Sequence, residues 1–250
     1  MKRTRSPEAL YAELSQVLTE GTADEALNQL DEICRSSPDD GGAFELRGLL
    51  AAQTGRPNLA VHYLEHADRL LPLEPLSYRI LAHAYSGIGR DKQAVELLHR
   101  LAINHADLPW YNRLLARDLL CQGYPELATD ALYQGVAFQP REDASWHDLS
   151  AAQSVQGDPP STCLRSVARA IALAPETVEY RVTASNLLIR MDEPLAAYQT
   201  VCQVITADQC DLDCECCLWR LIYLFDCFDD HPRMSCCYRR LKSMMMMMMP

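Results

Sequence analysis

The chain has 250 residues, of which 48% are hydrophobic, and its formal net charge at pH 7 is −11. This acidic balance disfavours non-specific nucleic-acid binding, because phosphate contacts need clustered lysine and arginine. No apolar run approaches the ~20 residues of a membrane span, and the basic residues 1–7 are followed by no apolar signal segment. The composition therefore predicts a cytoplasmic protein without nucleic-acid or membrane partners.

Small residues recur along the chain at a strict interval of 34 residues. One series consists of glycines: Gly21, Gly55, Gly89, Gly123 and Gly157. Another consists of alanines: Ala26, Ala60, Ala94, Ala128 and Ala196. A fixed period of this length is typical of a repeat solenoid. Each unit has an apolar stretch, the glycine, a second apolar stretch and often a proline, which predicts two antiparallel helices per unit.

A third series places a small residue in the first helix of each unit: Gly48, Ala82, Ala116, Ser150 and Ala184. Small side chains in this series and the alanine series let two helices approach closely, since larger groups would cost roughly 1–3 kcal/mol in overpacking. In the fifth unit the position where the series predicts alanine is occupied by Thr162, and Cys163 follows it. This departure predicts a local slip of one residue.

These series resemble the pattern of tetratricopeptide repeat proteins, in which aromatic, leucine-small, alanine and proline positions recur. The third unit carries it at Tyr78, Leu81, Ala82, Tyr85, Ala94, Leu98 and Leu101, and the fifth at Trp146, Leu149 and Ser150. The resemblance covers residues 6–208. It implies an all-α fold, a right-handed superhelical solenoid of about six to seven helix-turn-helix repeats.

This resemblance sets the expected domain organisation. Residues 1–208 are predicted to form the repeat array, with about six repeats. Residues 209–243 are predicted to form a cysteine-rich C-terminal helical pair, either a divergent seventh repeat or a cap. Residues 244–250 are predicted to form a disordered, low-complexity methionine tail.

A basic series lies three residues before the small residue of each first helix: Arg79, Arg113, His147 and Arg181. Two members gain a basic neighbour one turn later, His83 and Arg117. The resemblance implies that this flank lines an inner groove that holds an extended peptide or a partner's helix. The alternative is that these are ordinary solvated positions, paired with acidic neighbours such as Asp118 and Asp148. If the groove hypothesis holds, reversing the arginine charges should abolish partner capture without lowering the melting temperature.

Eight of the eleven cysteines lie after residue 201: Cys202, Cys210, Cys214, Cys216, Cys217, Cys227, Cys236 and Cys237. Cys210, Cys214 and Cys217 have helical spacing, and His231 with Cys236 would complete a four-ligand zinc site. Against this, the segment has no second C-x-x-C pair, and free cysteine is among the most buried residue types. We therefore prefer core packing and predict no metal and no cofactor. The alternative is a metal site formed by Cys210, Cys214, Cys217, His231 and Cys236.

Motifs that carry catalysis are missing from the sequence. It contains no phosphate-binding glycine loop and no H-E-x-x-H or G-x-S-x-G motif, and its seven histidines are dispersed. The sequence therefore predicts a non-catalytic adaptor or scaffold that holds an extended or acidic segment of a partner protein. One alternative is a regulatory module of an enzyme system whose cysteine-rich end senses metal or redox state. Another is a homo-oligomer assembled through the terminal repeats.

Overall fold

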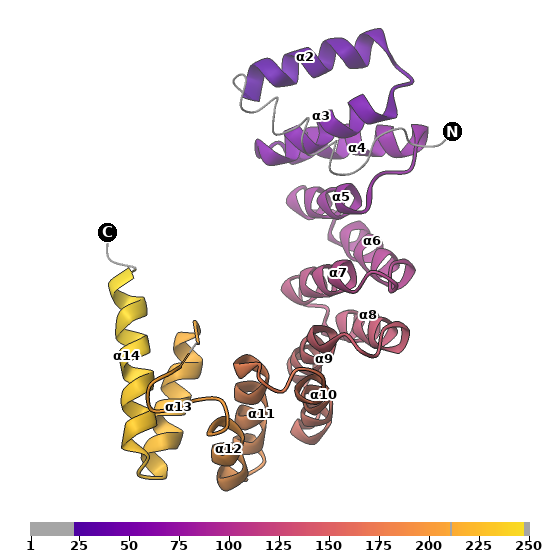
Figure 1. Ribbon diagram of the computed structural model, residues 1–250. Coiled ribbons are helices and arrows are strands. Elements are labelled where there is room, and N and C mark those ends of the chain that lie inside the picture. The colour runs from indigo at the N-terminus through magenta and orange to yellow at the C-terminus, as the bar shows by residue number, and fades with distance from the viewer. Residues whose placement is uncertain (1–22, 211, 248–250) are drawn as a thin grey trace. The chain divides into compact units, whose positions relative to one another are not determined.

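The structure is a computed structural model that describes residues 23–210 and 212–247 (Figure 1). Every regular element in these residues is an α-helix, which confirms the predicted all-α class. The chain divides into two compact units, residues 1–101 and 102–250. The division falls inside the predicted repeat array, and the boundary predicted at residue 208 stays a prediction.

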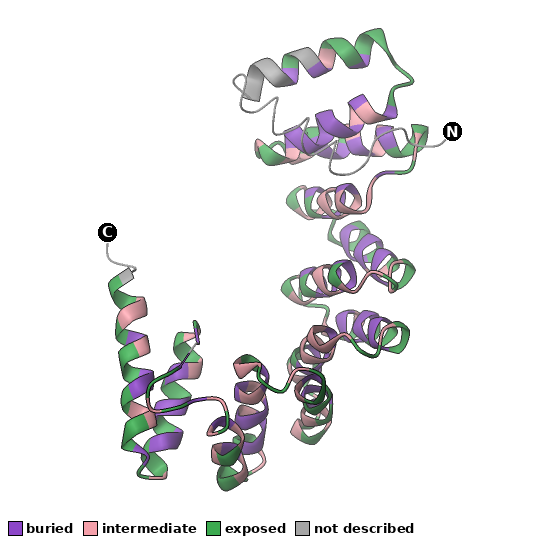
Figure 2. Ribbon diagram, viewed as in Figure 1, coloured by how far each residue is buried: buried purple, intermediate pink, exposed green. Residues whose placement is uncertain are grey.

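The helices follow one another in pairs. In the first unit they are α2 (Ala23–Ser36), α3 (Gly41–Gln53), α4 (Pro57–Leu70), α5 (Pro75–Gly87) and most of α6 (Asp91–Asn104). The second unit contains α7 (Pro109–Cys121), α8 (Pro125–Phe138), α9 (Asp143–Gln156), α10 (Pro160–Leu173), α11 (Val178–Arg190), α12 (Pro194–Val201), α13 (Glu215–Cys227) and α14 (His231–Met247). From α2 to α5 and from α7 to α14, each helix packs against the next one in the chain. Figure 2 shows the buried residues on the faces that these helices turn toward each other.

The turn between the two helices of a pair contains one residue in the left-handed backbone conformation. Four predicted glycines have positive φ angles: Gly55 (71°), Gly89 (76°), Gly123 (84°) and Gly157 (95°). Each of the four lies between the two helices of a pair, as the sequence pattern predicts, whereas Gly21 lies outside the described residues. Asp192 and Asp229 take this conformation in the last two pairs, with φ of 61° and 53°. Aspartate tolerates it better than most residues, although a side chain there still costs roughly 1–2 kcal/mol.

Close approach of the two helices of a pair depends on the small residues. A Cβ atom built on Gly48 of α3 would lie 2.6 Å from Cγ of Leu64 on α4. In α9 the hydroxyl of Ser150 donates to the carbonyl oxygen of Cys163 on α10 at 2.8 Å. Cys163 is fully buried where other pairs have alanine, which confirms the predicted slip. One pair later Ala197, rather than the predicted Ala196, is fully buried. It lies 34 residues after Cys163, so the shift of one residue carries over into this pair.

A buried ion pair joins α2 to α3 in the first unit. Arg47 stands where the neighbouring repeats have leucine, and its Nε and Nη2 donate to the two carboxylate oxygens of Asp31 at 2.8 and 3.0 Å. The hydroxyl of Tyr63 on α4 also donates to Asp31, at 2.9 Å. Hydrogen bonds from Arg47 hold the pKa of Asp31 below its ordinary value despite partial burial. The bidentate geometry explains how a charge replaces leucine in this core.

The C-terminal residues form the predicted helical pair, α13 and α14. Its core contains the fully buried side chains of Leu218, Phe225 and Cys237. The predicted disordered tail is wrong for residues 244–247, which continue α14, because methionine is a good helix former and the preceding turns are already helical. Residues 248–250 lie outside the described residues. Within the described part of the chain, no helix combines the length and apolarity that crossing a bilayer requires.

The contact at Gly48 generates a stability prediction. Gly48→Ala should lower the free energy of unfolding by about 1–3 kcal/mol, because overpacking against Leu64 outweighs alanine's better helix propensity. In a Leu64→Ala background the same change should cost clearly less, since the clashing atoms are gone. Urea unfolding of the two single variants and the double variant measures this coupling. Strictly additive losses would show that the two side chains do not limit the helix separation.

Candidate functional site

The six predicted groove residues are divided between the two units. Two of them, Arg79 and His83, lie on α5 in the first unit. The other four lie in the second unit: Arg113, Arg117, His147 and Arg181. Arg79 is half-buried, whereas His83 is exposed and lines a largely apolar pocket of about 710 Å³ with Leu49 and Ile80. The role of the six residues in partner binding stays a prediction, and their surroundings differ from one another.

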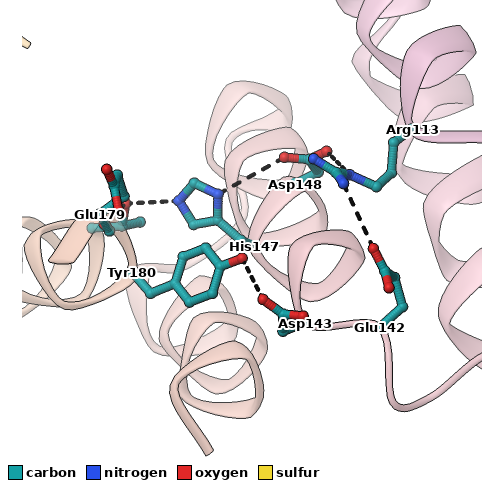
Figure 3. Close-up of polar contacts among 8 residues, drawn as sticks. Arg113, Glu142, Asp143, His147, Asp148, Glu179 and Tyr180 are labelled. Atoms are coloured by element: carbon teal, nitrogen blue, oxygen red, sulfur yellow. Dashed lines mark hydrogen bonds and ion pairs between the residues drawn. The ribbon is translucent and has the colours of Figure 1, made fainter. Parts of the chain in front are cut away.

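Arg113 on α7 is engaged by acidic residues of the next repeat. Its Nε lies 2.6 Å from Oδ2 of Asp148 on α9, and its Nη1 lies 3.6 Å from Oε1 of Glu142, the residue before α9. Figure 3 shows the guanidinium between these two carboxylates. All three side chains keep about a third of their surface exposed. Arg113 therefore ties two neighbouring repeats together.

His147 extends this polar network from α9 to α11 (Figure 3). Its Nε2 lies 3.0 Å from the hydroxyl oxygen of Thr183, which itself donates to the carbonyl oxygen of Glu179 at 2.9 Å. The threonine oxygen must then accept from His147, so Nε2 carries a proton. The other ring nitrogen, Nδ1, faces Oδ1 of Asp148 at 3.8 Å.

Asp148 and Tyr180 owe their shifted acidities to this network. Burial disfavours the ionised form of Asp148, but its contacts with His147 and Arg113 outweigh this effect and hold the pKa of Asp148 below its ordinary value of 3.8. The ring of Tyr180 lies 4.8 Å from that of His147, and its hydroxyl donates to Asp143 at 2.7 Å. Burial and this hydrogen bond raise the pKa of Tyr180 above its ordinary value. Because its pKa is lowered, Asp148 is ionised at neutral pH and pairs with Arg113.

Arg181 on α11 is also held, in its case mainly by backbone groups. Its Nε donates to the carbonyl oxygen of Pro175 at 2.7 Å, and its Nη1 donates to the carbonyl oxygen of Thr200 at 3.4 Å and to the side-chain oxygen of Gln203. These contacts connect the start of the α11–α12 pair to its end. The alternative drawn from the sequence, in which the basic residues pair with acidic neighbours such as Asp148, fits Arg113 but not the contacts of Arg181.

Arg117, by contrast, is exposed and lines a pocket on the first helices of two repeats. The pocket has a volume of about 380 Å³. Trp110, Leu114 and Arg117 contribute to it from α7 and are spaced i, i+4, i+7, which places them on one helix face. Ala151 of α9 lines the other side, and Trp110 is 54% exposed. An exposed indole and an exposed guanidinium therefore line the same pocket.

A second pocket in the same unit lies between α11 and α13, with a volume of about 450 Å³. Trp219 and Tyr223 of α13 line it and are 48% and 72% exposed. Ile189 and Arg190 of α11 line the facing side. The sequence analysis missed Trp110, Trp219 and Tyr223 as surface residues. For Trp110 the signal was its spacing, one turn before the basic residue Arg113 on the same helix.

The structure gathers a different set of cysteines from the predicted one. Among the described residues, the thiols of Cys214, Cys216 and Cys217 lie together, with all three sulfurs within 4.8 Å of one another. The helical spacing expected from Cys210 does not apply, because α13 begins only at Glu215. Cys210 is buried, with its sulfur 3.8 Å from that of Cys237.

The remaining predicted metal ligands also lie apart from these thiols. Cys236 is buried in the core of the last pair, and His231 is exposed at the start of α14. The five-residue set is therefore not assembled.

The three clustered thiols differ in acidity. Hydrogen bonds from Cys216 and Cys217 lower the pKa of Cys214, whereas burial raises the pKa of Cys217 to about 12.

Two arginines one turn apart on α7 provide a matched test of the network. Arg113→Glu should destabilise the fold by about 1–2 kcal/mol, because it brings a third carboxylate next to Asp148 and Glu142. Arg117→Glu makes the same charge change at an exposed position and should cost less than about 0.5 kcal/mol. Chemical unfolding of both variants measures the difference. Equal losses in the two variants would contradict a tethering role for Arg113. They would instead support the prediction from the sequence that reversing its charge leaves stability unchanged.

The acidity of Asp148 predicts a pH dependence. Its pKa is lower in the folded chain, so its stabilising effect is complete above its ordinary value of 3.8 and is lost as the pH falls through the folded value. Asp148→Asn should therefore destabilise the protein most near about pH 6 and much less near about pH 3. Urea midpoints of both proteins across this range give the comparison. A gap that stays constant with pH would refute the assignment.

The fold is shared with solved repeat structures of low sequence identity. The C-terminal part of a TPR repeat-containing protein from Cytophaga hutchinsonii superimposes with a TM-score of 0.65 at 9% identity, covering 94% of this chain and 95% of that chain. PilF of Pseudomonas aeruginosa gives a TM-score of 0.55 at 17% identity, covering 81% and 90%. MamA of Desulfovibrio magneticus RS-1, from residue 41 to its end, gives 0.50 at 19% identity, covering 66% and 92%.

These likenesses concern the fold alone. No protein-family model and no curated protein matches the sequence. The paired helices of this chain agree with the fold of these solved repeat structures. The chain is therefore an all-α protein with the tetratricopeptide repeat fold.

Proposed function

We propose that this protein is a non-catalytic adaptor that holds an extended segment of a partner protein against the first helices of its repeats. The pocket lined by Trp110, Leu114, Arg117 and Ala151 is the observation that carries the proposal. It lies on the helices whose inner flank binds peptides in the repeat family that the sequence resembles. It also combines an exposed apolar surface with a cation, which a merely solvated helix face does not need.

The chemistry of the pocket selects the partner segment. Trp110 offers a broad apolar surface for an aliphatic or aromatic side chain, and exposed tryptophan is characteristic of interface anchors. Arg117 can hold a carboxylate with two parallel hydrogen bonds. Asp148 also lines the pocket, but its charge is already compensated by Arg113. The segment proposed is an apolar anchor residue followed by acidic residues.

Contacts in the pocket also favour binding over catalysis. Its ionisable groups are two guanidiniums and one ion-paired carboxylate, and this set contains neither a nucleophile nor a general base with a partner to activate. The same pocket offers no broad basic face for phosphates, so a protein segment suits it better than nucleic acid. A cytoplasmic location and assembly through the terminal repeats stay predictions from the sequence.

Binding of defined peptides tests the proposal. A fluorescent peptide with a leucine followed by glutamates should bind the full chain, and the same peptide with lysines should bind at least about tenfold more weakly. Trp110→Ala should weaken binding of the acidic peptide by about tenfold, because the anchor surface is lost. Arg117→Glu should weaken it by at least about tenfold and reduce its salt dependence. Fluorescence anisotropy at several salt concentrations measures each affinity.

Arg169 supplies the matched control. It is exposed on α10, the second helix of its pair, so Arg169→Glu makes the same charge change away from the pocket. This variant should keep the wild-type affinity within about twofold. If Arg117→Glu and Arg169→Glu weaken the acidic peptide equally, net charge and not the pocket determines binding. Equal affinity for both wild-type peptides would also contradict the proposal.

A further inference from the structure

Three thiols converge where α13 begins. Cys214 is the N-cap residue of this helix, and Cys216 and Cys217 belong to its first turn. The sulfurs of Cys214 and Cys216 are 3.1 Å apart, and all three sulfurs lie within 4.8 Å of one another. Cys216 is exposed and the other two are half-buried. A ligand can therefore approach from solvent.

The surrounding residues hold this segment in place. Leu212 on one side and Leu218 on the other are both buried in the core of the last helices. Arg240 of α14 donates from Nε to the carbonyl oxygen of Leu212 at 3.0 Å and forms an ion pair with Asp213. The chain entering the thiol cluster is thus fixed from two directions. A site whose backbone is already ordered loses little entropy when it takes a ligand.

Core packing accounts for other cysteines of this region, and Cys217 also packs against the core, whereas Cys214 and Cys216 are not part of it. Cys210, Cys236 and Cys237 are buried in the apolar core of the last pair, where cysteine acts as a small hydrophobic residue. Packing gives no reason for an exposed thiol at Cys216 within contact distance of Cys214. The cluster therefore needs a different explanation.

We propose that Cys214, Cys216 and Cys217 form a trigonal thiolate site for a soft monovalent cation, Cu(I). Thiolate sulfur prefers soft ions, and Cu(I) is satisfied by thiolates alone. Structural zinc takes four protein ligands, whereas this group of described residues offers three. Binding replaces the three thiol protons with one Cu(I), so three protons are released and no redox change occurs. The resulting negative charge lies at the N-terminus of α13, which favours it.

A chelator competition measures this binding. The full chain is reduced, kept free of oxygen and titrated with Cu(I) in the presence of bathocuproine disulfonate. It should withhold one Cu(I) per chain, and X-ray absorption should show three sulfur ligands. Cys216→Ser changes an exposed side chain and leaves the core intact. This variant should bind Cu(I) with an affinity at least about tenfold lower, because even the residues that support metal ligands contribute that much to affinity.

Other exposed cysteines provide the control. Cys121 and Cys227 are exposed and lie outside the cluster, so the double variant Cys121→Ser/Cys227→Ser should keep the wild-type affinity. Circular dichroism checks that every variant remains helical. Unchanged retention in Cys216→Ser, or its loss in the double control, would overturn the proposal. So would retention of Zn(II) under conditions where the chelator removes all Cu(I), and these outcomes are independent of peptide binding.

Discussion

The close approach of two helices within each pair is the constraint on which the rest of this structure depends. Gly48 leaves no room for a Cβ atom against Leu64, and Ser150 replaces that contact with a hydrogen bond to the backbone at Cys163. These contacts set the angle at which the second helix returns, so they also determine which face of each first helix remains available. The pockets in the second unit lie on such faces.

Polar contacts between repeats decide what those faces can bind. Arg113 joins α7 to α9 through Asp148, and His147 joins α9 to α11 through Thr183. A guanidinium that is already paired in this way contributes less to an incoming carboxylate, because an existing ion pair would have to be broken first. The exposed Arg117 has no such role in the tether. Two basic positions one turn apart on the same helix thus divide between holding the fold together and facing solvent.

The last helical pair uses cysteine for two physical purposes. In its core, Cys236 and Cys237 fill small apolar spaces beside Phe225. At the start of α13, Cys214 and Cys216 lie in contact at the surface, where packing needs no sulfur. The difference follows from where the helix begins. Residues 212–214 are not helical, so the thiol of Cys214 meets those of Cys216 and Cys217 at the first turn of α13 instead of following one helix face.

The amino-acid sequence by itself determined the architecture. Gly55 and Gly89 mark the turns because a positive φ is a local requirement, and small residues such as Ala82 mark the helix contacts because their size is visible in the sequence. Only the tertiary structure decided the partners of Arg113 and the grouping of Cys216 with its neighbours. Side chains from different repeats meet only after the pairs stack. The start of α13 at Glu215 lies between the buried Leu212 and Leu218, and no period of the sequence marks it.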